Sequence, residues 1–275
     1  MSRRASRLGW GAAGAVVVAW TLLPVAWIVA LSLKQPGDLR SGRFLPGAVT
    51  LEHYRAVFAT PLFTRALENS VGIACIATAV SVALATCAAY ALARLRFRGK
   101  AVVLGLALGI AMFPVVSLVG PLFDLWRTVG LYDTWLGLIL PDLSFTLPLA
   151  IWVLSAYFRE LPWELEEAAL VDGATPWQAF LKVAVPLAAP GVLTAALLTF
   201  FFAWNDFAFG ISLTSTDRAR TVPAALAFFT GASQFEQPTG AIAAAAVVVT
   251  VPVVILVLVF QRRIVSGLTA GAVKG

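Results

Sequence analysis

Few side chains in this sequence of 275 residues could carry out chemistry by themselves. The only histidine, His53, lies in a polar stretch and is expected to be a solvated loop residue. Cys75 and Cys87 share one apolar segment, have no metal-ligand spacing, and are expected to pack as small side chains. No lysine belongs to a Gly-rich phosphate loop, and neither H-E-x-x-H nor G-x-S-x-G occurs. The sequence therefore contains no nucleotide-hydrolysing, zinc-peptidase or serine-hydrolase motif, and we expect no cofactor or metal bound by this chain.

Carboxylates deep inside apolar segments would indicate a proton or ion relay. The acidic residues of the apolar regions, Asp124, Asp142 and Asp206, are instead expected near segment ends. A coupling-ion mechanism then lacks its usual residues, and the energy for any movement of solute must come from a partner.

The most regular group of acidic residues lies in the stretch ELPWELEEAALVDGATPWQAFLKVAVPLAAP, residues 160–190. Glu160, Glu164 and Glu167 have the spacing of one stripe on a helix, which we expect to begin at Pro162. Asp172 and Gly173 are expected to end that helix, because Gly accepts the left-handed C-cap conformation. The stripe would suit a basic partner surface, although a solvated hairpin that only closes a loop would have the same pattern.

A second helix is predicted directly after the glycine. Thr175 is an N-cap candidate, Pro176 fits the first helical position, and Gln178 completes a capping box. Pro186 and Pro190 mark the return to the next apolar segment. The stretch is thus predicted to be two short helices around a glycine turn.

The composition of the chain indicates which elements surround this stretch. Hydrophobic residues make up 60% of the chain, charged residues 12%, and the mean hydropathy is +0.88. These values are typical of an integral membrane protein, in which each helical span needs about 20 apolar residues. We predict an all-α polytopic membrane protein, one transmembrane domain over residues 1–275. Its six spans are expected at about 10–33, 70–93, 101–123, 135–158, 185–204 and 240–260, with a loop at 159–184 and a tail at 261–275.

The basic residues predict which side each loop faces. Of the 20 Lys and Arg residues, 12 fall at the two ends of the chain and in the loops after spans two and four, against 8 in the other loops. The positive-inside bias therefore places both termini and the loop at 159–184 in the cytoplasm. The basic residues lie beside span ends and form no patch with aromatic residues, so no nucleic-acid partner is expected. On the outer side, residues 50–58 predict a short surface helix.

The loop at 159–184 resembles a known family. Glu167, Ala168 and Ala169, then Gly173, then Val183, Val185 and Pro186 are similar to the signature "EAA, three residues, G, nine residues, I-x-L-P" of permease subunits of binding-protein-dependent ABC importers. Val replaces the usual Ile and Leu. The runs NSVGIA, AAYALARLRFRGK, FAWNDF and QRRIVSGLTAGAVKG resemble the carbohydrate branch of that family, and the run around LILPDLSF is similar to the trehalose-importer permeases of mycobacteria.

The resemblance implies an importer subunit that moves a sugar, such as the disaccharide trehalose, across the plasma membrane. The loop would transmit motion from a partner ATPase, which would bind ATP and Mg²⁺ and perform the hydrolysis. The other implied partners are a second permease subunit, an ATPase dimer, an extracytoplasmic sugar-binding protein and membrane lipid. The residues implied in ATPase coupling are Glu164, Glu167, Ala168, Ala169, Asp172, Gly173, Val183 and Pro186.

The candidates for the substrate path are polar or aromatic residues at span ends: Asn69, Ser117, Trp204, Asn205 and Asp206. The alternative for these residues is that the two asparagines cap helices and Trp204 belongs to an interfacial belt. The substrate also has alternatives, namely maltodextrin, another sugar or glycerol phosphate. A stand-alone channel or a secondary carrier would need charged residues within spans or broken-helix repeats.

Overall fold

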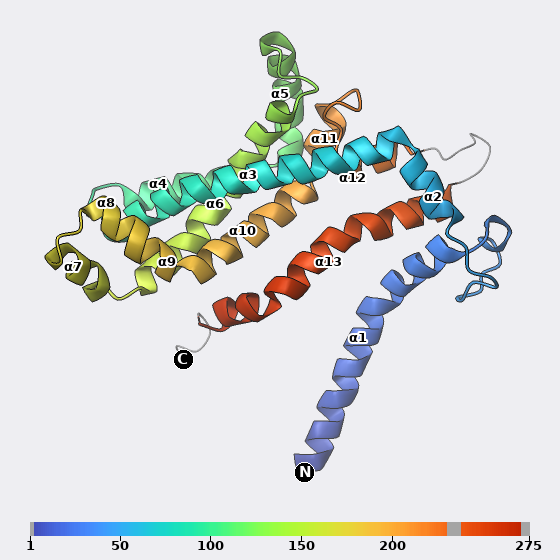
Figure 1. Ribbon diagram of the computed structural model, residues 1–275, viewed down its shortest axis with the longest axis horizontal. Coiled ribbons are helices and arrows are strands. Elements are labelled where there is room, and N and C mark those ends of the chain that lie inside the picture. Colours follow the sequence, from blue (N-terminus) through green and yellow to red (C-terminus); the bar gives the residue numbers. More distant parts are fainter. Residues whose placement is uncertain (1–2, 230–237, 271–275) are drawn as a thin grey trace. The chain divides into compact units, whose positions relative to one another are not determined.

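A computed structural model of the chain describes residues 3–229 and 238–270, with side chains from 10 to 229 and from 238 to 261. Helices and turns make up these ranges, and no β-strand occurs in them beyond an isolated bridge between Lys34 and Val49. Within the described ranges, five helices are long and apolar enough to cross a membrane, and a bent pair of helices, α4 and α5, supplies a sixth candidate span (Figure 1). These findings confirm the predicted all-α membrane class.

The chain forms two compact units. The first comprises Met1–Thr64 and Leu226–Pro252, and the second comprises Arg65–Ala225 and Val253–Gly275. The first unit contains α1 (Arg3–Leu33), the 3-10 turn η1 (Pro36–Asp38) and α2 (Glu52–Ala59), and α13 (Thr239–Ala270) begins in it. α2 confirms the short helix predicted near residues 50–58.

A buried lysine organises the loop of the first unit. The Lys34 side chain is fully buried, its Nζ donates to the carbonyl of Arg43, and it lies 4.7 Å from the centre of the Trp27 ring. The Lys34 carbonyl accepts a hydrogen bond of 2.9 Å from His53 Nε2. His53 is only 9% exposed, so the expectation of a solvated histidine was wrong. The reason is that α2 turns this side chain inward, against Gly240.

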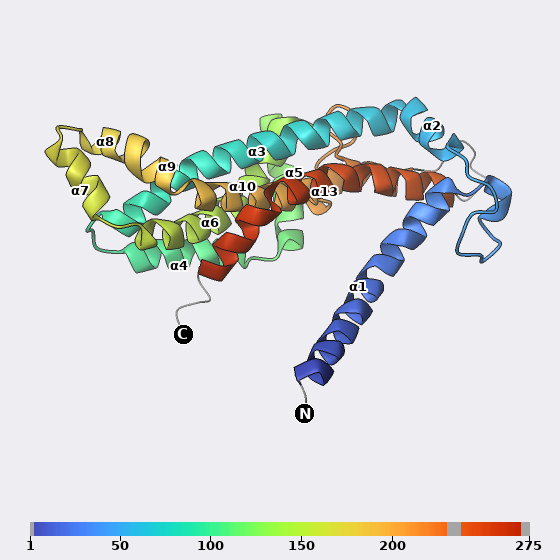
Figure 2. The ribbon, with the colours of Figure 1, turned by 60° about the horizontal axis from the view of Figure 1, so that its bottom comes forward.

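The second unit contains most of α3 and the helices from α4 to α11, and α12 begins in it. Their bounds are α3 Pro61–Arg94, α4 Lys100–Ala111, α5 Val115–Val129, α6 Trp135–Glu160, α7 Glu164–Val171, α8 Pro176–Ala179, the π turn η2 Phe180–Ala184, α9 Val185–Leu187, α10 Ala189–Trp204, α11 Ala208–Ser212 and α12 Val222–Ala227. Within this unit α3, α4, α6 and α10 run alongside one another, and α7 and α8 lie at one end of them in both views (Figures 1 and 2).

Small side chains allow the long helices of the second unit to approach closely. The core between α3, α6 and α10 contains Ala85, Ala150 and Ala195 in addition to the larger Leu154 and Phe158. Small residues at helix contacts are typical of membrane proteins, where close van der Waals packing drives association. Cys75 and Cys87 do not take part, because both lie on the exposed face of α3. The expectation that they pack within the chain was therefore wrong.

The predicted third span is broken. Instead of one helix over 101–123, α4 and α5 meet at an angle of 86°. Pro114 causes the break, since it has no N–H to donate and disfavours helical geometry at the preceding residue. Pro114 itself is extended, with φ −64° and ψ 118°, and precedes the first turn of α5.

The ends of other spans also differ from the prediction. α3 begins at Pro61, well before residue 70, and α10 begins at Ala189 after a π turn. α13 continues as a helix to Ala270, so the predicted tail at 261–275 is helical in its first part. Residues 271–275 of that tail lie outside the described residues.

Candidate functional site

The glycine turn after α7 has the geometry that the sequence predicts. Gly173 has a φ of +89°, a left-handed conformation that residues with a Cβ rarely adopt. Its N–H donates to the Leu170 carbonyl (3.1 Å), and the Ala174 N–H donates to the Ala169 carbonyl (2.9 Å). This pair of bonds is a Schellman motif, which satisfies the last carbonyls of the helix. A Cβ at position 173 would meet no atom within 4 Å, so conformation alone requires glycine here.

The capping box that starts α8 is present in both directions. The Thr175 N–H donates to Gln178 Oε1 (2.9 Å), and the Gln178 N–H donates to Thr175 Oγ1 (3.3 Å). Pro176 follows as the first helical residue. We call α7, the turn at Gly173 and α8 the α7–α8 hairpin.

The first helix of the hairpin starts later than expected. α7 begins at Glu164, and Pro162 lies two residues before it in the linker that follows α6. Glu160 belongs to the end of α6. The predicted acidic stripe of Glu160, Glu164 and Glu167 is therefore wrong, because its first member sits on a different helix.

A π turn follows the hairpin and leads through the short helix α9 to α10. Over Phe180–Ala184 the backbone widens, and the Val185 N–H bonds to the carbonyl of Phe180. The proline ring of Pro186 would clash with the Lys182 carbonyl in a regular α-helix, and the wider turn gives it room. Val183 lies within this turn and is half-buried, and Pro186, which follows it, is exposed.

The outer surface of the hairpin is exposed and is both acidic and apolar. Glu164, Glu167 and Asp172 are exposed, and the Glu167 carboxylate accepts a bond from Trp163 Nε1. Apolar side chains lie among them, with Val171 85% exposed and Trp177 61% exposed. Ala168 is exposed, and Ala169 is half-buried. An exposed apolar surface with acidic groups is typical of a site that contacts another protein.

The one buried side chain of α7 is a glutamate that the sequence analysis did not single out. Glu166 is 5% exposed, and its Oε1 lies 2.8 Å from Arg94 Nε. Its Oε2 accepts a hydrogen bond of 2.8 Å from the Tyr90 hydroxyl. No local pattern could pair these groups, because 76 residues separate Tyr90 from Glu166.

The π turn that follows α8 is anchored in the same place. Phe180 is 3% exposed, and its ring centre lies 4.6 Å from that of Tyr90 and 5.1 Å from that of Trp177. Tyr90 also meets Phe158 of α6 edge-on at 5.7 Å. Tyr90 of α3 therefore contacts α7, the π turn after α8, and α6.

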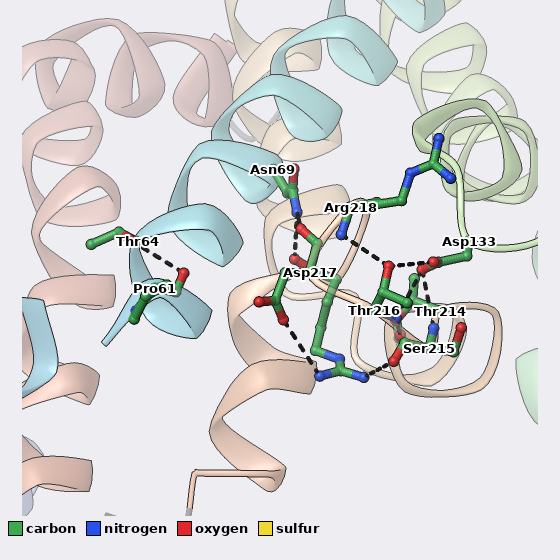
Figure 3. Close-up of polar contacts among 11 residues, drawn as sticks. Pro61, Thr64, Asn69, Asp133, Thr214, Ser215, Thr216, Asp217 and Arg218 are labelled. Carbon is green, nitrogen blue, oxygen red and sulfur yellow. Dashed lines mark hydrogen bonds and ion pairs between the residues drawn. The ribbon is translucent and has the colours of Figure 1, made fainter. Parts of the chain in front are cut away.

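At the other end of these helices a polar network orders the loop before α12. The Asn69 amide donates to the carbonyls of Asp217 and Arg220, both at 3.0 Å, and accepts from Trp135 Nε1 at 2.8 Å. Asp133 accepts from the backbone of Ser215 and Thr216, as Figure 3 shows. The loop is thus tied to the beginnings of α3 and α6.

The predicted substrate-path residues differ in burial and in hydrogen-bond partners. Asn69 is buried in the network just described, and Trp204 is 2% exposed with its ring stacked on Phe200. Asp206 caps α11, since its carboxylate accepts the N–H groups of Phe209 and Gly210. Ser117 and Asn205 are exposed, and the Asn205 amide bonds to the Phe201 carbonyl of its own helix.

One carboxylate lies deeper than the sequence predicts. Asp142 was expected near a span end, but it sits within α6 and is 1% exposed. α10 packs along α6, and Phe145, one turn after Asp142, stacks on Phe202 of α10 at 5.7 Å, so this part of α6 lies inside the helix packing.

Comparisons with known proteins extend over nearly the whole chain. Residues 59–269 match the family described as binding-protein-dependent transport system inner membrane component. The chain is 57% identical over 266 residues to the trehalose transport system permease protein SugB of Mycobacterium tuberculosis, with 97% of each chain covered. It is 40% identical over 265 residues to the trehalose/maltose transport system permease protein MalG of Thermococcus litoralis, with 95% of each covered.

A solved structure has the same fold. One chain of a bacterial ABC transporter involved in the import of the acidic polysaccharide alginate superposes with a TM-score of 0.78 at 24% sequence identity. The superposition covers 95% of this chain and 98% of that chain. At this identity the likeness concerns the fold.

Proposed function

This chain belongs to the family of binding-protein-dependent transport system inner membrane components, and we propose that it is one permease subunit of an ATP-driven sugar importer. The first candidate for the sugar is the disaccharide trehalose. The proposal draws on relatives that are named for trehalose at 57% identity and for trehalose and maltose at 40% identity. Maltodextrin, another sugar or glycerol phosphate are the alternatives for the substrate.

The observation that carries the mechanism is the α7–α8 hairpin. Its Gly173 turn, capping box and exposed Glu167 have the arrangement expected of a surface that fits into a cleft of another protein. The chain has no phosphate loop, so hydrolysis of ATP, with its Mg²⁺, is assigned to a partner ATPase dimer. In this proposal ATPase closure moves the hairpin, and the hairpin moves the spans.

The proposal places both termini and the hairpin on the cytoplasmic side. The excess of Lys and Arg in the corresponding loops, 12 against 8, supports this orientation. The network around Asn69 and Asp133 then faces the outside of the cell, where a sugar-binding protein would release its sugar to the importer. A second permease subunit would complete the translocation path.

Substrate contacts in this chain are proposed at the exposed polar residues Ser117 and Asn205. Hydrogen-bonding side chains at the path surface are what a sugar requires. Asn69, Trp204 and Asp206 are already engaged within the chain, so we assign them a supporting role near the path.

The proposal is tested by purifying the tagged chain from its native membrane and identifying its partners by mass spectrometry. We expect an ATPase, a second permease and a sugar-binding protein, and we expect the binding protein to prefer trehalose in a ligand screen. An importer of another solute would be indicated by a different preferred ligand. A complex without any ATPase would overturn the proposal.

A further inference from the structure

The side-chain contact of α7 with α3 is made by one ion pair and one hydrogen bond. Glu166 is the single buried residue of α7, and the other side chains of this helix are exposed or half-buried. Hydrophobic burial therefore does little to hold α7 in place. Both carboxylate oxygens of Glu166 have a partner on α3, namely Arg94 at 2.8 Å and the Tyr90 hydroxyl at 2.8 Å.

Arg94 also contacts the linker that leads into α7. In addition to Glu166, its Nη2 donates to the Leu161 carbonyl at 2.9 Å, in the linker between α6 and α7. Its guanidinium lies 5.1 Å from the centre of the Trp163 ring, within the range of a cation–π contact. The Arg94 and Glu166 side chains are only 8% and 7% exposed. A pair buried to this degree is difficult to break, because a single remaining charge would lack a partner.

The two adjacent glutamates of α7 face different directions. Neighbouring residues on a helix are separated by about 100° around its axis. Glu166 consequently points to α3, whereas Glu167 is exposed on the outer surface. A helix built this way has one acidic group for an external partner and another for its own attachment.

We propose that Arg94 and Glu166 are positioning residues that fix α7 to the end of α3, so that a force on the hairpin reaches α3 directly. This inference rests on the proposed function. Without the pair, α7 itself would be linked to the spans through the backbone, by way of α6 and the π turn, and the ring contact of Tyr90 with Phe180 would hold only the segment after α8. Tyr90 contributes through its hydroxyl to Glu166 and through its ring to Phe180.

The test compares variants of the assembled complex in proteoliposomes. Glu166→Gln and Arg94→Ala are expected to assemble and to hydrolyse ATP, but to move at least about tenfold less sugar per ATP hydrolysed. Tyr90→Phe keeps the ring contacts and should have a smaller effect. The double variant Arg94→Glu with Glu166→Arg reverses the pair and should recover part of the ratio. Arg96→Ala and Glu160→Gln are matched controls, since both residues are exposed and neighbour the pair in sequence.

Hydrogen exchange of the amides at 164–173, measured in the same complexes, gives a readout that does not depend on transport. Faster exchange in Glu166→Gln and Arg94→Ala, but not in the controls, is the expected result. Unchanged exchange in both variants would overturn the inference, and so would an unchanged ratio of sugar to ATP. If the wild-type complex shows no ATP-dependent uptake, the proposed function fails while the exchange data still decide whether the pair holds α7.

Discussion

The left-handed backbone conformation at Gly173 is a requirement that concerns this single residue of the hairpin. Its φ of +89° costs a residue with a Cβ about 1–2 kcal/mol, whereas open space surrounds it. Gly173→Val should therefore harm the turn through its backbone alone, and Gly173→Asn should be milder because Asn tolerates the left-handed region. We expect sugar uptake by the complex to fall in the order Gly, Asn, Val. Equal uptake in all three would show that the left-handed turn does not matter for transport.

Glu167 is the residue that we expect to contact the ATPase. A charge-assisted hydrogen bond at an interface contributes about 1.5–3 kcal/mol, which corresponds to roughly 10- to 150-fold in affinity. Glu167→Ala should weaken ATPase association by a factor in this range while membrane insertion stays normal, measured by titration of the ATPase onto nanodiscs. Glu160→Ala is the control, since Glu160 is also exposed but lies on α6. A normal affinity for Glu167→Ala would remove this residue from the interface.

Contacts between residues that are close in the sequence could be predicted, whereas contacts between distant residues could not. The Gly173 turn and the Thr175 capping box involve neighbours along the chain, and local rules were sufficient for both. The Arg94–Glu166 pair joins a span end to a loop helix far along the chain, and nothing in either segment identifies the other. Glu167 was singled out and Glu166 was not, because only the former belongs to the signature.

At the scale of elements, Asn69 holds together α3, α6 and the loop before α12. It takes part in three hydrogen bonds, each of which contributes about 1 kcal/mol. Asn69→Ala should loosen the loop, and trypsin should cleave after the exposed Arg218 at least several-fold faster in the folded complex. Asn205→Ala is the control, because the Asn205 amide bonds only within its own helix. An unchanged cleavage rate would mean that the loop is held by other contacts.

The length of the apolar segments was sufficient to predict that the spans exist, but it did not predict their bends and ends. Hydropathy averages over a window and is insensitive to a single proline, so the 86° break at Pro114 was missed. The ends of α3 and α13 were also missed, because a helix can continue into polar sequence once its first turns are formed. The burial of Asp142 depends on packing between α6 and its neighbours, which no property of its own segment reveals.

For the whole molecule, the family and its fold could be recognised from the spaced signature and the number of spans. The match over residues 59–269 confirms the family. The substrate and the partners are recognised by surfaces that this chain forms together with other subunits, and its sequence alone does not define these surfaces. Substrate and partners therefore have to be measured on the assembled complex.

In the proposed function this chain moves a sugar only when a partner ATPase drives it. The most direct measurement is uptake of labelled trehalose into proteoliposomes that contain this chain, its partner permease and the ATPase, with the sugar-binding protein outside. We predict uptake with ATP inside the vesicles and none with a non-hydrolysable analogue or without the ATPase. Uptake at the same rate in the absence of ATP would contradict the account and would indicate a channel or a secondary carrier.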